Sequence, residues 1–218
     1  DLRMKGTPAY GKFSTIKRDI MGPFCRVPLM QCRHEVISMR HGVAGTLEWN
    51  REKISFYKGK GYIEKDRGSS FPEEYLWTQC TEGAEGRLSL MAAAATIPFG
   101  IFRFHGTIAE IWYGGKCYRL ATYCGARVRE QNSRRLVIAQ KELLFQAELQ
   151  EKHPQKLLAP RSGAMQRTVC EHAACAVRYR LLQHGAVIFD EICAPAGFEA
   201  DLKRKRKYTE EKERTEKG

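Results

Sequence analysis

The stretch "HEVISMRHGVAGTLEW", residues 34–49, is followed after the three residues "NRE" by "KISFYKGKGYIEKD", residues 53–66. Both runs are rich in β-branched and aromatic residues, and the short polar segment between them is typical of a turn. The two runs therefore predict a pair of antiparallel strands joined as a hairpin.

The same pattern continues along the chain. The dipeptides Gly114-Gly115 and His184-Gly185 each lie between two β-rich runs and predict tight hairpin turns. Residues 141–150, "KELLFQAELQ", are compatible with a short helix, but apolar side chains at every second position from Leu143 to Leu149 favour a strand. We expect eight to ten short strands, under a fifth of residues in helices, and an all-β antiparallel barrel or sandwich.

Length and charge bound the remaining possibilities. At 218 residues and 43% hydrophobic content, the chain is long enough for a real core, and we expect one β-barrel domain over residues 1–200. Residues 201–218, "DLKRKRKYTEEKERTEKG", predict a disordered charged tail.

The rest of the chain keeps most of the net charge of +12, spread over many segments rather than gathered in one stripe. We therefore expect no nucleic-acid partner. We expect a cytoplasmic protein that can make peripheral contact with an anionic membrane.

The eight cysteines contain no Cys-x-x-Cys pair. Structural zinc sites usually draw on such pairs, so the spacing argues against a metal, and we expect reduced thiols. His34 and Glu35 are consecutive, so in a strand they point to opposite faces and form no local chelate. This leaves open a set of metal ligands assembled from several strands. Sequence templates for nucleophile elbows, phosphate-binding loops, dinucleotide folds and helical zinc sites are all missing.

Residues 62–66 carry the most distinctive chemistry. In an extended strand Tyr62, Glu64 and Asp66 share one face. Inside an apolar barrel, two neighbouring carboxyl groups do not both ionise cheaply, so one would keep its proton near neutral pH. Such an acid suits the protonation of an alkene, and the rings of Tyr75 and Trp77 would stabilise the resulting cation.

An alternative interpretation gives this acidic pair no chemical role. Glu64 and Asp66 would then face solvent or pair with nearby basic residues, namely Arg33, Arg40 or Lys65. Spacing alone leaves both interpretations open.

Four segments carry a resemblance to a known family. They are "GPFCRVPLMQCRHEVISMRHGVAGTL" (22–47), "ISFYKGKGYIEKDRGSSFPEEYLWTQC" (54–80), "LSLMAAAATIPF" (88–99) and "IWYGGKCYRLATYCGARV" (111–128). In this order they resemble the tocopherol cyclase family, especially its bacterial members, and the resemblance runs from about residue 17 to residue 193. The block that begins at Gly61 is the most specific part.

The resemblance implies a fold and an activity. The family is expected to have a lipocalin-like double β-barrel, related to that of carotenoid hydratases. Its members are longer at the N-terminus, so this chain is expected to be the second barrel plus part of the first. The implied reaction is the acid-catalysed cyclisation of a prenylated benzoquinol to a chromanol, as in vitamin E biosynthesis, by an intramolecular lyase of the isomerase class. It is redox-neutral, so we expect no nicotinamide, flavin or metal cofactor.

The resemblance also implies roles for individual residues. Asp66 or Glu64 would donate the proton, and Tyr62, Tyr75 and Trp77 would line the substrate site. Either His34 or His41 would orient the quinol hydroxyl or accept its proton. Because these histidines are seven residues apart, only one of them faces the cavity in an unbroken strand.

Two points leave the substrate open. Arg67 stands where the family commonly has a tryptophan, in an Asp-Trp-Gly sequence, so another prenyl quinol or an isoprenoid is also compatible with the site. A second hypothesis is a lipocalin-like carrier that binds a hydrophobic isoprenoid or lipid without changing it, since carrier and enzyme both need an apolar cavity.

Overall fold

The computed structural model describes residues 2–6, 19–27, 30–83, 85–99, 102–150 and 154–202. This part of the chain forms strands throughout, apart from two short 3-10 helices. In chain order the elements are β1 (Leu2–Gly6), η1 (Gly22–Arg26), β2 (Cys32–Trp49), β3 (Glu52–Gly68), β4 (Glu74–Cys80), β5 (Leu88–Phe99), β6 (Phe102–Tyr113), β7 (Lys116–Ala121), η2 (Thr122–Cys124), β8 (Arg127–Gln131), β9 (Arg135–Gln140), β10 (Leu143–Leu149), β11 (Gln155–Arg161), β12 (Ala164–Gln183) and β13 (Ala186–Asp201). The expected all-β antiparallel fold is confirmed.

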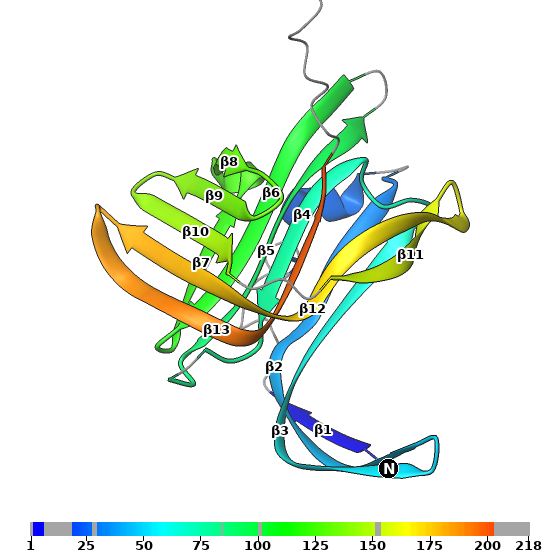
Figure 1. Ribbon diagram of the computed structural model, residues 1–218. Coiled ribbons are helices and arrows are strands. Elements are labelled where there is room, and N and C mark those ends of the chain that lie inside the picture. The colour runs from blue at the N-terminus through cyan, green and yellow to red at the C-terminus, as the bar shows by residue number, and fades with distance from the viewer. Residues whose placement is uncertain are drawn as a thin grey trace, which may run out of the picture.

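The strands form two sheets (Figure 1). The large sheet has the order β7-β6-β5-β4-β13-β12-β10-β9-β8, with β11 paired to β12, and the small sheet has the order β1-β2-β3. Parts of the β2–β3 hairpin pack against the large sheet, and the rest continues beyond it as an arm that carries β1 (Figure 1). Residues of both sheets line a cavity between them.

Strand β4 separates two apolar clusters, because its successive side chains point to opposite faces. Leu76 and Cys80 belong to the main core inside the curled large sheet, together with Phe145, Tyr179 and Phe198. Trp77 points the other way and packs against a second cluster between the sheets, formed by Ile20, Met21, Val36, Met39 and Met91. One strand thus supports the core on one side and the site on the other.

Side chains, rather than a backbone ladder, bring the two ends of the large sheet together. In the described part of the chain no ladder joins β7 to β8, although β7 contacts β9 and β6 contacts β8. Gln140 on β9 accepts a hydrogen bond from the backbone N–H of Ala121 at 3.0 Å and donates one to the carbonyl of Arg119 at 3.0 Å. The amide of Gln140 therefore takes the place of a neighbouring strand at the edge of β7, and the curled sheet is held in a barrel-like form.

The local expectations are mostly confirmed. Residues 143–149 form a strand, and the turn at Gly114-Gly115 has φ angles of 56° and 81°, which favour glycine. The expected number of eight to ten strands is wrong, since the described part contains thirteen. The strands without a clear sequence signal are short, and β11 contains Pro160, which is tolerated because that strand is paired on one side only. Of the expected tail, Asp201 still belongs to β13, and residues 203–218 lie outside the described residues.

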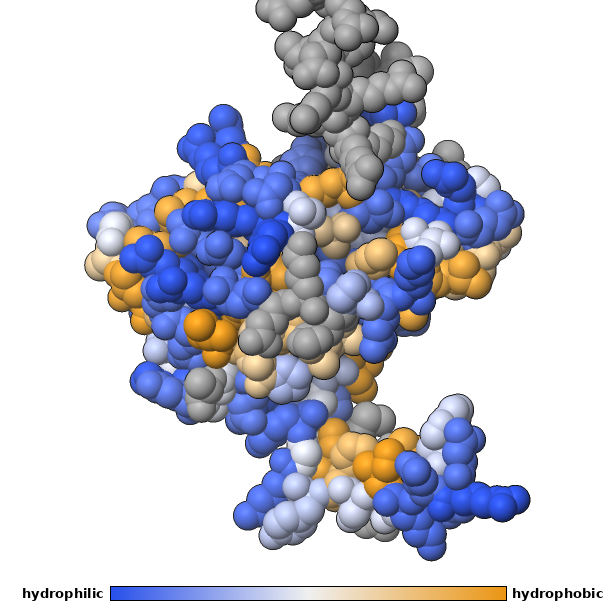
Figure 2. Space-filling model, viewed as in Figure 1, coloured by the Kyte–Doolittle hydropathy of each residue, from blue (hydrophilic) through white to orange (hydrophobic). Residues whose placement is uncertain are grey.

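The arm carries several exposed apolar side chains. Trp49 is 68% exposed and Tyr57 is 81% exposed, and Leu47 and Ile54 lie exposed on the same two strands. Figure 2 shows apolar residues gathered on the arm, away from the body. No helix within the described residues has the length and apolarity needed to cross a membrane.

The two hydrogen bonds between the side chain of Gln140 and the edge of β7 form a contact that we call the Gln140 seam. This seam gives a prediction about stability. Gln140→Leu keeps the size of the side chain but leaves the Ala121 N–H and the Arg119 carbonyl without their partner. We expect the free energy of unfolding to fall by about 1–3 kcal/mol for each group that stays buried, as measured by chemical denaturation. Gln146→Leu is the matched control, because Gln146 is a half-buried sheet glutamine with no side-chain hydrogen bond among the described residues, and its effect should stay within about 0.5 kcal/mol. Equal effects of the two variants would contradict the role of the seam.

Candidate functional site

A cavity of about 340 Å³ lies between the large sheet and the β2–β3 hairpin. Most of its lining is apolar and includes Phe24, Phe71, Trp77, Ile97, Phe104 and Leu157. Its volume lies within the range of small-molecule sites, and it has the usual character of an apolar pocket with a few polar groups. The polar groups are therefore the candidates for chemistry.

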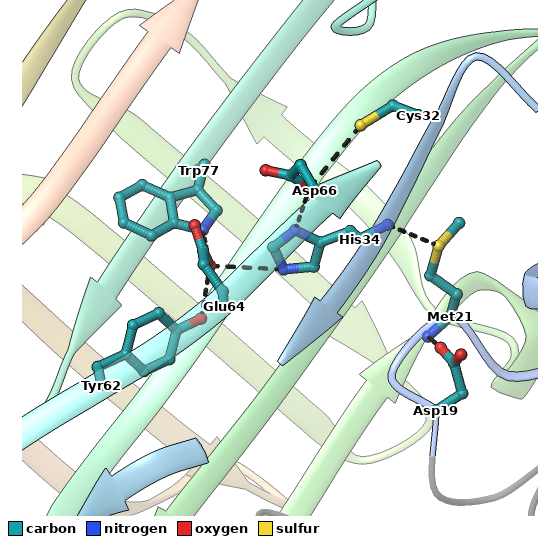
Figure 3. Close-up of polar contacts among 8 residues, drawn as sticks. All are labelled: Asp19, Met21, Cys32, His34, Tyr62, Glu64, Asp66 and Trp77. Carbon is teal, nitrogen blue, oxygen red and sulfur yellow. Dashed lines mark hydrogen bonds and ion pairs between the residues drawn. The ribbon is translucent and has the colours of Figure 1, made fainter. Parts of the chain in front are cut away.

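The register between β2 and β3 brings three of these polar groups together. His34 lies directly opposite Asp66 in the ladder, and Val36 lies opposite Glu64. Because side chains two residues apart share a face, His34, Glu64 and Asp66 all point into the cavity. His34 Nδ1 is 2.8 Å from Asp66 Oδ1, and His34 Nε2 is 3.6 Å from Glu64 Oε2 (Figure 3). The imidazole is thus placed between two carboxyl groups.

Glu64 has two further partners, and both reach the same oxygen. The hydroxyl of Tyr62 donates to Glu64 Oε2 at 2.6 Å, and the indole Nε1 of Trp77 donates to Glu64 Oε2 at 3.1 Å (Figure 3). Trp77 is thereby fixed against the acidic group, while Tyr62 supports Glu64 without lining the cavity itself. No contact to the second oxygen, Oε1, is found among the described residues, so it can carry a proton or meet a ligand.

Burial shifts the pKa values of these groups. The pKa of Glu64 is raised, first by burial, although His34 and the hydrogen bonds from Tyr62 and Trp77 act in the opposite direction. Burial alone would lower the pKa of His34, but the hydrogen bond to Asp66 and the charges of both carboxylates raise it above its usual value. Burial and Asp66 also raise the pKa of Cys32 to about 12, so its thiol stays protonated. The site therefore holds protons more tightly than the same groups would in water.

The same three residues are the one group among the described residues with the composition of a cation site. One ligand atom from each of His34, Glu64 and Asp66 lies within 4.8 Å of the others. His34 Nδ1 is engaged with Asp66 and Glu64 Oε2 with two donors, whereas His34 Nε2 is buried without a hydrogen-bond partner in the described part of the chain. The same three side chains can also bind a proton, in which case the imidazole supplies the positive charge.

Of the remaining predicted site residues, Tyr75 lines the cavity and His41 does not. Tyr75 lines the cavity with Trp77, and its ring packs edge-on against Phe71 with centroids 5.8 Å apart. His41 is buried outside the cavity lining, where its Nδ1 is 3.0 Å from the hydroxyl of Ser38. The ladder is irregular between Val36 and His41, so two bulges separate the environments of the two histidines.

The basic residues that were the alternative partners of the acidic pair lie elsewhere. Arg33 donates to the carbonyl of Val27, and Arg40 pairs with Glu82. Lys65 lies opposite Glu35, on the other face of the hairpin. Glu64 and Asp66 are therefore paired with a histidine rather than with an arginine or a lysine.

Sequence reasoning missed two further carboxyl groups in the cavity lining, those of Glu171 on β12 and Glu199 on β13. The hydroxyl of Tyr75 donates a hydrogen bond to Glu199 Oε1. The segment "GFEAD", residues 197–201, alternates as residues 62–66 do and places Glu199 and Asp201 on one face. That signal lies beyond residue 193, where the family resemblance was seen to end.

Comparison with known proteins gives two plant relatives. The chain is 28% identical over 121 residues to a probable chloroplastic tocopherol cyclase of Oryza sativa subsp. japonica, a match that covers 53% of this chain and 26% of the relative. It is 31% identical over 97 residues to the chloroplastic tocopherol cyclase of Zea mays, covering 42% of this chain and 20% of the relative. The matches thus span about a quarter or less of the relatives' length.

Two solved structures are similar at low sequence identity. The crystal structure of kievitone hydratase from Nectria haematococca has a TM-score of 0.45 and 11% identity, with 78% of this chain and 53% of that chain covered. The structure of CghA with Sch210972 has a TM-score of 0.49 and 9% identity, with 79% and 55% covered.

The family comparison extends over almost the whole chain. Residues 2–200 match the family model described as tocopherol cyclase-like. This range contains every strand of both sheets up to the end of β13, and with it the residues of the cavity. The protein therefore belongs to the tocopherol cyclase-like family, as the resemblance of residues 17–193 predicted.

Proposed function

We propose that the cavity binds a prenylated benzoquinol and closes its chromanol ring by protonating the prenyl double bond, as an intramolecular lyase. The observation that carries this proposal is the group of His34, Glu64 and Asp66, which lines an apolar cavity with Trp77 against Glu64. An apolar pocket accepts the prenyl chain, and an acid beside it supplies the proton. The plant relatives, which are named as tocopherol cyclases, point to the same substrate class.

Glu64 is the better proton donor of the two carboxyl groups. Its pKa is raised by burial, so it keeps a proton in a range where an exposed glutamate has lost it. Tyr62 and Trp77 occupy Oε2 as donors, which leaves Oε1 to carry the proton into the cavity. Asp66 is held by His34 Nδ1 at 2.8 Å and serves to keep the imidazole charged and in place.

The proposed reaction needs no electron transfer. The proton of Glu64 forms a C–H bond with one carbon of the double bond, and the other carbon becomes a tertiary cation. The indole ring of Trp77 and the negative charge of Asp66 stabilise that cation. The phenolic oxygen of the quinol then forms the C–O bond of the new ring and releases its proton. The protonated His34 offsets the charge left on Glu64.

Direct incubation tests the proposed function. We expect the protein to convert a prenylated benzoquinol to a product of the same mass that lacks one phenolic hydroxyl, as detected by chromatography and mass spectrometry. Recovery of bound but unchanged quinol would instead support the carrier hypothesis. Absence of both binding and conversion would refute the substrate class.

Substitution of single acids identifies the donor. Glu64→Gln keeps the hydrogen-bonding shape but removes the transferable proton, so quinol should still bind while kcat falls by about 10²–10⁴-fold. Asp66→Asn should cause a smaller loss, because it weakens the support of His34 and the stabilisation of the cation but leaves the proton donor in place. Glu35→Gln is the matched control, since Glu35 is exposed on the opposite face of β2 and should leave kcat unchanged. A larger loss in Asp66→Asn than in Glu64→Gln would assign the donor to Asp66.

The charge of His34 gives a prediction that does not depend on turnover. The imidazole of the folded protein should titrate above its ordinary pKa of 6.5, as followed by NMR. Asp66→Asn should lower this pKa, because burial lowers the pKa of His34 and is then opposed chiefly by the charge of Glu64. Since the folded pKa is raised, His34 adds stability below about pH 6.5 that is lost as the pH rises through the folded pKa. A His34 pKa that is unchanged by Asp66→Asn would contradict the geometry of the group.

A further inference from the structure

A second titratable group lines the cavity from the large sheet, facing the hairpin that carries Glu64. It consists of Glu199 on β13 and Tyr75 on β4, whose hydroxyl donates to Glu199 Oε1. Glu199 is also the direct cross-strand partner of Trp77, and the indole Nε1 of Trp77 donates to Glu64 Oε2 at 3.1 Å. One tryptophan is thus the immediate neighbour of both carboxyl groups.

Glu199 has no compensating cation of its own among the described residues. Arg167 is a basic residue whose charge acts on Glu199, but its direct contacts lie elsewhere: it pairs with Asp201 at 2.6 Å and donates to the backbone carbonyls of Pro72 and Glu73. Its guanidinium also lies over the ring of Tyr75, 5.5 Å from the centroid. Arg167 therefore fixes the position of Tyr75 and leaves Glu199 free to gain and lose a proton.

The surroundings of Glu199 set the pH range in which its carboxyl group exchanges that proton. Burial raises the pKa of Glu199 to about 7, and the negative charges of Glu171 and Asp201 act in the same direction. The hydrogen bond from Tyr75 and the charge of Arg167 lower it again in part. A carboxyl group with a pKa near the working pH is suited to accept a proton in one step and release it in the next.

We infer that Glu199, oriented by Tyr75, accepts the phenolic proton of the substrate while Glu64 supplies the proton to the prenyl double bond. This inference rests on the proposed function, which requires one proton to enter the substrate and another to leave it. Two carboxyl groups on opposing walls of an apolar cavity, with Trp77 adjacent to both, match that requirement.

The proposed step balances. Glu64 loses a proton as the C–H bond forms from the π electrons of the double bond. The phenolic oxygen forms the C–O bond to the cationic carbon, the electron pair of its O–H bond returns to oxygen, and the proton passes to the carboxylate of Glu199. The side chain of Glu64 is 24% exposed, so solvent returns its proton between turnovers.

Three variants test the acceptor, each assayed with a prenylated benzoquinol. Glu199→Gln should lower the rate of chromanol formation by about 10²–10⁴-fold. It should also abolish the fall of kcat/KM on the acidic side of about pH 7, because that limb of the pH profile reports a base in the free enzyme. The cation formed without an acceptor should lose a neighbouring proton or capture water, so alkene isomers and hydrated products should increase. Tyr75→Phe should keep the acidic limb but move it to higher pH, because the donor that stabilises the charged form of Glu199 is gone.

The matched control is again Glu35→Gln, because Glu35 is exposed on the opposite face of β2 and lies outside the cavity lining. We expect its rate, pH profile and product ratio to stay those of the wild type.

A stability measurement serves as a readout independent of turnover. The folded protein keeps a proton on Glu199 between about pH 4.5 and about pH 7 that the unfolded chain releases, so stability falls as the pH rises through this window. Glu199→Gln should remove this part of the pH dependence.

The outcomes separate the two proposals. Active wild type, with unchanged rate, pH profile and products in Glu199→Gln, would overturn the role of Glu199 and leave the proposed function intact. Wild-type protein that forms no chromanol would overturn both.

Discussion

The backbone register between β2 and β3 is the constraint on which the cavity depends. It sets His34 against Asp66 and places Glu64 two residues away on the same face. A slip of one residue would turn Glu64 and Asp66 to the face opposite His34 and bring Lys65 to the face of His34 instead. The acidic group therefore exists only because the hairpin is in this register and packs against the large sheet with that face.

The apolar surroundings then decide how these groups behave. The same three side chains on an exposed strand would exchange protons with water near their ordinary pKa values. Against Trp77 and the apolar cluster between the sheets, burial becomes the largest influence on Glu64 and Glu199, and both pKa values are raised. Burial thus favours the protonated form of Glu64, and the hydrogen bond to Asp66 favours the charged form of His34.

The large sheet provides the rigid support for this arrangement. Leu76 and Thr78 alternate with Trp77 on β4, so the strand is anchored in the main core directly behind the site. Thr78 shares a hydrogen bond with the buried hydroxyl of Tyr179, and the Gln140 seam holds the far ends of the same sheet. Displacement of Trp77 would therefore disturb core packing, which keeps its indole fixed against Glu64.

The sequence by itself determined the strand-rich fold, the hairpin turns and the acidic face at residues 62–66, because alternation and turn chemistry are local properties. The quoted motifs also identified the family. Only the tertiary structure decided that His34, rather than His41, joins Glu64 and Asp66, because the register sets His34 opposite Asp66 and His41 opposite Gly61. It also brought Glu199 to Tyr75 across 124 residues of chain. Such a pairing depends on the order of strands in the sheet, and no local pattern encodes that order.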